Sequence, residues 1–164
     1  MSKTFRSGKK RLKPVIWSHD RRGDSSASTG FCMHLASHGF IVFAITHFDG
    51  SASYSENKYG TQVLYNSSKR NDSQEFKLLD QQIDFRVMEL SSLLVDIIDV
   101  DESDKLRANI LGVDSHKARI AERELTVGGV NYGGTSALEF AAQLGDSNCK
   151  CLILYNPWLY PHYD

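Results

Sequence analysis

Cysteine, proline and long apolar runs are scarce in this chain of 164 residues. It contains three cysteines and three prolines, and no apolar run approaches the roughly 18 residues that a membrane-spanning helix needs. An odd, small number of cysteines argues against a disulfide framework and fits free thiols in a reducing compartment. We therefore expect no transmembrane segment and an intracellular protein, either cytoplasmic or part of an organellar assembly.

An excess of charge of one sign is also lacking. The 19 Lys and Arg residues are balanced by 20 Asp and Glu residues, for a formal net charge of -1. Because nucleic-acid-binding domains are usually basic, the composition argues against a nucleic-acid partner. Neither a histidine nor a second cysteine pair joins Cys149 and Cys151 in a four-ligand zinc site, so we expect no metal and no other cofactor. Their spacing on a strand instead predicts two thiols that face the core.

Basic residues do gather at the start of the chain. They are Lys3, Arg6, Lys9, Lys10, Arg11 and Lys13. A solvated tail is the favoured interpretation, and a contact arm for an acidic partner surface is the main alternative. A targeting segment is disfavoured because the stretch has too few apolar residues for an amphipathic helix, and it has no secretory signal. We divide the chain into a basic N-terminal tail, residues 1–13, and one domain, residues 14–164.

Beyond this tail, apolar runs alternate with helical patterns. Four runs rich in β-forming residues predict strands over residues 14–19, 40–47, 124–128 and 149–156. Apolar residues at helical spacing predict helices over residues 25–39, 74–100 and 135–145. Residues 48–73 are polar and predict a long loop, and residues 105–111 predict a short helix. Strands that alternate with helices predict an α/β fold with a parallel sheet of about four strands and helices on both faces.

The stretch VGGVNYGG contains a glycine pattern of specific chemical meaning. Gly129 and Gly133 have the spacing of the G-x-S-x-G nucleophile elbow, but Asn131 stands where the serine belongs. Asparagine tolerates the positive φ of such a turn, so it preserves the backbone shape. Its amide nitrogen is a poor nucleophile because the lone pair is delocalised. Gly133 and Gly134, after Tyr132, are expected to let the strand and the following helix approach closely.

Five segments in order along the chain carry a family resemblance. They are VIWSHDRRG, LASHGFIVFAITHFDGSAS, IDFRVMELSSLLVDI, VGGVNYGG and LILYNPWLYP. Together they resemble platelet-activating-factor acetylhydrolases of the plasma and intracellular type II kind, over nearly the whole chain. The resemblance implies a truncated α/β-hydrolase fold. It also implies a serine–aspartate–histidine triad that cleaves short acyl chains from phospholipids.

The positions that the resemblance assigns to the triad depart from the family pattern. Asn131 takes the place of the nucleophile, and Asn156 takes the place of the acid. A neutral amide would not stabilise an imidazolium as a carboxylate does. The histidine of the family lies beyond Asp164 by position, and we interpret His162 as a terminal surface residue. No catalytic residue is therefore expected to be functional.

The loop that would supply an oxyanion hole departs as well. The family's glycine-rich S-H-G-x-G becomes Ser-His-Asp-Arg-Arg-Gly, which brings His19, Asp20 and Arg21 into the loop. We expect these side chains to crowd the site and Asp20 to oppose a developing negative charge. Arg21 and Arg22 could bind a phosphate, but a solvated, charged loop is the favoured interpretation.

These departures predict a pseudoenzyme that acts as a scaffold or interaction subunit of a larger assembly. A phospholipid-binding or acyl-chain-binding module and a residual carboxylic-ester hydrolase are the alternatives. The apolar run that begins at Phe40 and the one that begins at Cys149 are expected to form the two sheet edges, ending at His47 and Tyr155. Apart from Lys150 near the start of the second run, neither carries the lysines or prolines that protect natural edges. We therefore expect a protein partner to cover both edges, with closure by the chain's own loop and tail as the alternative.

Overall fold

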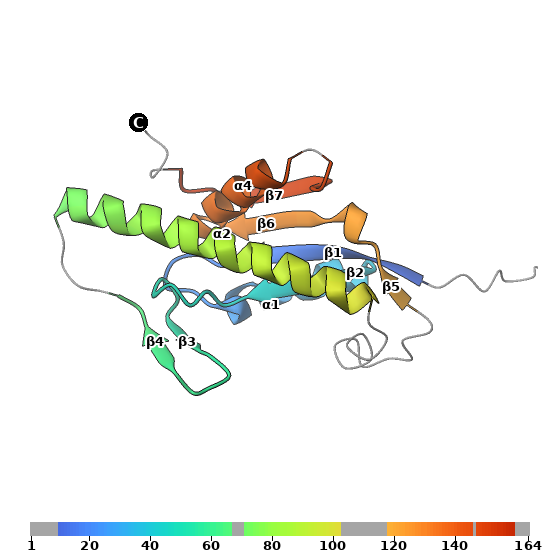
Figure 1. Cartoon of the computed structure of the whole chain (residues 1–164), viewed down its shortest axis with the longest axis horizontal. Helices are drawn as coiled ribbons and strands as arrows, with labels where there is room; N and C mark the ends of the chain where they lie inside the picture. Colours follow the sequence, from blue (N-terminus) through green and yellow to red (C-terminus); the bar gives the residue numbers. More distant parts are fainter. Residues whose placement is uncertain (1–9, 67–70, 103–117, 146, 160–164) are drawn as a thin grey trace, which may run out of the picture.

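In the computed structural model, residues 10–66, 71–102, 118–145 and 147–159 are described. Their centre is a sheet of five strands whose main order is β2-β1-β6-β7. These strands are β1 (Lys10–Ser18), β2 (Phe40–Ile45), β6 (Thr126–Val130) and β7 (Cys151–Tyr155), and all of their pairings are parallel. The apolar runs of the sequence thus form the predicted parallel sheet, with β2 and β7 at its edges (Figure 1).

The first strand begins earlier than the sequence predicts. β1 starts at Lys10, because residues 10–12 pair in parallel with β5 (Ala118–Ile120), a short strand that the sequence analysis missed. Lys13 then pairs with Phe40 of β2. The last four residues of the expected basic tail are therefore part of β1, which begins four residues before the expected start at Pro14. The tail that precedes them lies outside the described residues.

Helices cover both faces of the sheet, as predicted. The described α-helices are α1 (Thr29–Ser37), α2 (Asp72–Glu102) and α4 (Tyr132–Leu144), and a short helix η1 (Ser25–Ser28) precedes α1. Successive residues of a strand point to opposite faces. Trp17 of β1 contacts Phe31 of α1, with ring centroids 4.6 Å apart, whereas Ile16 joins the core cluster under α2 and α4. α1 therefore lies on one face, and α2 and α4 lie on the other (Figure 1).

The core depends on the apolar stripe of α2. Residues of this stripe at spacings of three, four and seven residues are buried, namely Leu79, Ile83, Val87, Leu90 and Ile97. They pack with Ile16 of β1, Val127 of β6 and Phe140 of α4. Full burial of such side chains stabilises a fold by about 1.5 to 3 kcal/mol each. None of the helices among the described residues is long and apolar enough to cross a bilayer.

The segment predicted to be one long loop contains a small antiparallel hairpin. Its strands are β3 (Tyr54–Glu56) and β4 (Gln62–Leu64), with Ser55 opposite Val63. The side chain of Asn57 shapes the turn between them, because its Oδ1 accepts hydrogen bonds from two backbone N–H groups of that turn. Another short helix, η2 (Glu122–Glu124), precedes β6. The helix predicted over residues 105–111 lies outside the described residues.

The cysteines of the last strand differ from the prediction. Cys149 precedes β7 and is half-buried, whereas Cys151 is exposed, so the two thiols do not both face the core. β7 is an edge strand whose face toward α1 is incompletely covered, which explains the exposure of Cys151 and of Tyr155. Position along a strand sets the face of a side chain, but it does not say whether that face is buried.

Candidate functional site

The glycine-rich stretch forms a sharp turn between β6 and α4. Asn131 occupies its tip with φ 51° and ψ -113°, a backbone conformation that non-glycine residues rarely adopt. The turn is held by the backbone N–H of Asn131, which donates to the carbonyl oxygen of Tyr155 at 2.9 Å. A Cβ on Gly133 would lie 2.3 Å from the carbonyl oxygen of Ser18, so only glycine fits between β1 and α4. The backbone thus keeps the shape of a nucleophile elbow.

The carboxylate of Asp20 lies where the N–H groups of this turn converge. Its Oδ1 accepts hydrogen bonds from the backbone N–H of Tyr132 at 3.2 Å and from that of Arg21 at 2.7 Å. Its Oδ2 accepts one from the side-chain amide of Asn131 at 3.2 Å. In α/β-hydrolases the oxyanion hole combines the N–H after the nucleophile with an N–H from a neighbouring βα loop. Asp20 therefore places a carboxylate oxygen where a reaction oxyanion would bind.

Arg21 is tied to α2 instead of being solvated. Its Nη2 lies 2.8 Å from Oε1 of Glu75, and only 16% of its side chain is exposed, so the expectation of a solvated loop is wrong for this residue. Its guanidinium lies 5.9 Å from the ring centroids of both Tyr132 and Trp158. Asp20, Arg21, Asn131 and Trp158 line a cavity of about 270 Å³ at the turn.

The position assigned to the acid lies after the neighbouring strand. Asn156 follows β7, has φ 50° and is exposed. The backbone on either side of it binds the turn: Tyr155 accepts from Asn131, and the N–H of Trp158 donates to the carbonyl oxygen of Asn131 at 3.1 Å. The strand end is thus adjacent to the elbow, as the resemblance implies. His162 lies outside the described residues.

A buried chain of three polar side chains lies beside the elbow, and the sequence analysis missed it. Oγ of Ser18 lies 2.8 Å from Nε2 of His47, and Nδ1 of His47 lies 2.6 Å from Oε2 of Glu89. This is the order of a serine–histidine–acid triad. Ser18 and His47 are both 0% exposed, however, so no substrate can reach the hydroxyl. The three hydrogen-bonded side chains join the end of β1, the loop after β2 and α2.

Burial determines the protonation of His47 and Glu89 in this hydrogen-bonded group. Desolvation lowers the pKa of His47 well below its ordinary value, and the nearby Arg86 lowers it further. Desolvation also raises the pKa of Glu89 to about 7. Neutral His47 can donate from Nδ1 to Glu89 and accept at Nε2 from Ser18, which satisfies both ring nitrogens. The contact between His47 and Glu89 is therefore a hydrogen bond between a neutral imidazole and a carboxyl group.

Arg86 lies between the Ser18–His47–Glu89 group and the elbow, and it contacts the loops on both sides. Its side chain is fully buried, and its Nε donates to Oδ2 of Asp49 at 3.0 Å. Its Nη1 donates to the carbonyl oxygen of His19 at 2.8 Å, and its Nη2 donates to Oγ of Ser51 at 2.5 Å. The guanidinium also lies 4.7 Å from the ring centroid of Tyr132, the residue after the elbow tip. One cation thus holds the loop after β1, the loop after β2 and the start of α4.

One signal in the sequence could have revealed this network. Arg86 and Glu89 lie within the apolar stripe of α2, between Ile83 and Leu90, where a charged residue must find a buried partner. Their partners follow β1 and β2, and the carboxyl ends of parallel strands meet at one edge of the sheet. Among the described residues, no group of three or more His, Cys, Asp or Glu side chains is placed to hold a metal ion.

Together, the parallel sheet, the strand–turn–helix corner and the N–H groups that converge on it define a protein of the α/β-hydrolase class. The chain belongs to the family described as platelet-activating factor acetylhydrolase, isoform II, whose family model matches residues 1–164. This family is the one that the five sequence segments indicate.

Named relatives are similar over most of this chain. It is 29% identical to platelet-activating factor acetylhydrolase of Bos taurus and 28% identical to that of Canis lupus familiaris, each over 159 residues. Each match covers 90% of this chain and 35% of the relative, so the chain spans about a third of their length. Among solved structures, a ferulic acid esterase from Streptomyces cinnamoneus is 20% identical, with a TM-score of 0.54 over 81% of this chain and 33% of the esterase. That likeness supports the α/β-hydrolase fold alone.

Proposed function

We propose that this chain is a non-hydrolytic member of the platelet-activating factor acetylhydrolase family that serves as an interaction subunit. The observation that carries the proposal is the pairing of Asp20 with the elbow. Its carboxylate accepts the N–H groups of Tyr132 and Arg21, and the side chain at the elbow tip is the amide of Asn131.

Both catalytic requirements of an acyl transfer fail at this turn. An amide nitrogen cannot be activated by a base to attack an ester carbonyl, so no acyl-enzyme forms. The N–H groups that would stabilise a tetrahedral intermediate already bind an anion in the resting protein. Loss of one oxyanion-hole donor costs about a hundredfold to a thousandfold in rate, and here two are occupied.

A fluorophosphonate probe and a chromogenic short-chain ester test this proposal. We expect no covalent labelling of the protein and no ester hydrolysis above the buffer rate. Asn131→Ala should leave both results unchanged, because the amide has no catalytic role. Labelling or turnover that disappears in Asn131→Ala would contradict a non-hydrolytic function.

The sheet edges support the role as an interaction subunit. Among the described strands, β2 and β7 each pair with a neighbour on one side only, and every residue of β2 is half-buried. At the end of β7, Tyr155 is 69% exposed. Apolar edge strands with unpaired backbone groups favour pairing with another chain. A protein partner that covers β2 and β7 would bury these groups.

The oligomeric state tests this role. We expect the purified chain to associate through its edges when the partner is absent, and Tyr155→Lys to reduce the association because a lysine at an edge disfavours strand pairing. Tyr59→Lys is the matched control, since Tyr59 is 80% exposed and lies in the turn of the β3–β4 hairpin. A stable, well-folded monomer in analytical ultracentrifugation would count against the role.

A second candidate function, acyl-chain binding, is favoured by an apolar cavity next to the elbow. It measures about 590 Å³, and Trp17, Phe31, Val130, Ile153 and Tyr155 contribute to its lining. Cavities of this size and character accept small apolar ligands. Native mass spectrometry of the purified protein tests this function. A co-purifying lipid that is lost in Ile153→Asp supports it, and a lipid-free spectrum argues against it.

A further inference from the structure

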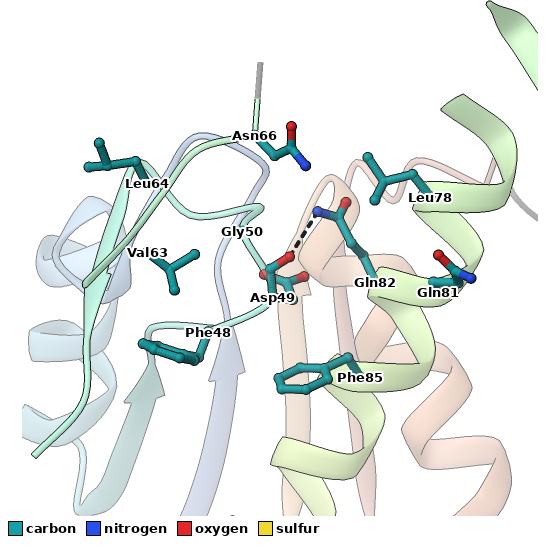
Figure 2. Close-up of a pocket in the computed structure, with 10 residues that line it drawn as sticks. All are labelled: Phe48, Asp49, Gly50, Val63, Leu64, Asn66, Leu78, Gln81, Gln82 and Phe85. Carbon is teal, nitrogen blue, oxygen red and sulfur yellow. Dashed lines mark hydrogen bonds between the residues drawn. The ribbon is translucent and has the colours of Figure 1, made fainter. Parts of the chain in front are cut away.

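A cavity lies between the β3–β4 hairpin and α2, apart from the elbow. Its volume is about 620 Å³. Phe48 and Val63 form the wall on the hairpin side, and Leu78 and Phe85 of α2 form the opposite wall (Figure 2). The size falls within the range of small-molecule sites, which are mostly apolar with a few polar groups.

One polar atom at this cavity has no hydrogen-bond partner in the part of the chain that the structure describes. Gln82 is 3% exposed, and its Nε2 donates a hydrogen bond to the carbonyl oxygen of Asp49 at 3.1 Å. That bond fixes which end of the amide is nitrogen, because an amide oxygen in the same place would face another oxygen. The other end, Oε1, is buried without a hydrogen-bond partner among the described residues and lies on the cavity side of the helix (Figure 2). Such an orphaned acceptor carries a desolvation cost that a donor from a ligand would relieve.

The charge of the cavity narrows the class of ligand. Of the described residues that line it, Asp49 alone carries a charge, and its carboxylate is 1% exposed and paired with Arg86 at 3.0 Å. Among these described residues, a charged ligand would find no counter-ion to compensate for its lost hydration. The aromatic rings of Phe48 and Phe85 offer apolar surface to a flat molecule (Figure 2).

From this geometry we propose a small-molecule site in the cavity between the hairpin and α2, with Oε1 of Gln82 as its specific acceptor. Its ligand is a neutral, largely apolar molecule with one hydroxyl or N–H donor. The apolar body lies between Phe48 and Phe85, and the donor reaches Oε1 of Gln82 by displacing the side chains that close over this atom in the unliganded protein. This site is independent of the elbow and of the hydrolytic or non-hydrolytic character of the chain.

Two pairs of probes that differ only by a methyl group test the site. They are para-cresol with its methyl ether, and indole with N-methylindole. NMR titration of the methyl resonances of Val63, Leu64 and Leu78 reports both affinity and location. We expect the donor-bearing member of a pair to bind about tenfold more tightly than its methylated partner, as one buried hydrogen bond gives. Whether hydroxyl or N–H is preferred follows from comparison of the two pairs.

Gln82→Met removes the acceptor at nearly constant volume, and Gln81→Met is the matched control on the exposed neighbouring residue. We expect Gln82→Met to reduce the tenfold ratio to less than about twofold and Gln81→Met to preserve it. Val63→Phe narrows the cavity without touching Gln82 and should weaken every probe. The proposal is overturned if methylated and unmethylated probes bind equally to the unsubstituted protein. It is also overturned if no probe shifts these methyl resonances. That result is expected if Oε1 binds only water.

Discussion

The backbone N–H of Tyr132 donates a hydrogen bond to the carboxylate of Asp20 at 3.2 Å, and this contact joins the loop after β1 to the first residue of α4. In an active esterase an N–H group at this point of the turn stabilises the oxyanion of the intermediate. Here the same donor binds an anion that the protein carries permanently. The other carboxylate oxygen binds Asn131, so one residue holds both the tip of the elbow and the position that follows it.

Replacement of Asp20 measures the strength of this contact. We expect Asp20→Ala to lower the free energy of unfolding by about 1 to 3 kcal/mol, because two backbone donors and one amide lose their acceptor. Asp20→Asn retains one side-chain oxygen and should cost less than about 1 kcal/mol. Urea-induced unfolding of the two variants measures both values. Equal losses in the two variants would show that the acceptor oxygen does not stabilise the turn.

Arg86 is expected to contribute more than any exposed ion pair. Arg86→Met leaves the carboxylate of Asp49 buried without a counter-charge and should cost about 3 to 5 kcal/mol in unfolding free energy. Arg86→Lys should not rescue the loss, because a single ammonium cannot reach Asp49, Ser51 and the carbonyl of His19 together.

Arg21→Met is the control for Arg86. Arg21 also pairs with a carboxylate, that of Glu75, but the pair is partly exposed, so we expect a loss of about 0 to 1 kcal/mol. Chemical denaturation measures the loss of unfolding free energy in Arg86→Met, Arg86→Lys and Arg21→Met. Both substitutions of Arg86 should give larger losses than Arg21→Met. A loss of unfolding free energy in Arg21→Met as large as that in Arg86→Met would show that burial does not determine how much these ion pairs stabilise the fold.

Local sequence patterns predict much of this fold. The apolar runs predict all four strands of the main sheet path, and the stripe from Leu79 to Ile97 predicts α2. The glycine pattern around Asn131 predicts the turn between β6 and α4 because its chemistry is confined to a few consecutive residues. The β3–β4 hairpin and β5 were missed because strands of three residues are too short to show a periodic pattern.

The polar network could not be predicted because its members are far apart in the sequence. Ser18 and Glu89 contact opposite nitrogens of His47, yet 29 and 42 positions separate them from it. Asp20 illustrates the same limit. Its charge alone indicates repulsion of an oxyanion, but its role as a bound acceptor depends on where the N–H of Tyr132 points. Only the packed loops determine that direction.

The buried carboxyl group of Glu89 should make stability depend on pH. Burial raises its pKa from 4.5 to about 7, so the folded protein binds this proton more tightly than the unfolded chain. The resulting stabilisation is complete below the unfolded pKa and is lost as the pH rises through the folded pKa. The lowered pKa of His47 has the opposite effect on stability. Below pH 6.5 the unfolded chain binds a proton at this residue more readily than the folded protein does, so the stabilisation is lost as the pH falls.

The substitution Glu89→Gln separates these two contributions. The variant lacks the stabilisation that protonated Glu89 gives at low pH. Its cost in unfolding free energy should therefore be larger at about pH 5 than at about pH 8. Urea unfolding of the variant and of the unsubstituted protein at both pH values gives the difference directly. A cost that is equal at the two pH values, or larger at the higher one, would show that Glu89 is not protonated near neutral pH in the folded protein.

The close approach of α4 to β1 predicts that an added methyl group is destabilising at Gly133 but not at Gly30. A Cβ on Gly133 would lie 2.3 Å from the carbonyl oxygen of Ser18 and 2.5 Å from that of His19, and both contacts are with backbone atoms that cannot move alone. We therefore expect Gly133→Ala to cost at least about 3 kcal/mol or to prevent folding, as overpacking at a rigid contact does. Gly30 in α1 has open space at its Cβ position, so Gly30→Ala should stabilise the helix by about 0.5 to 1 kcal/mol. Thermal unfolding of both variants should give shifts of opposite sign, and a Gly133→Ala protein as stable as the unsubstituted chain would mean that the elbow does not press against β1.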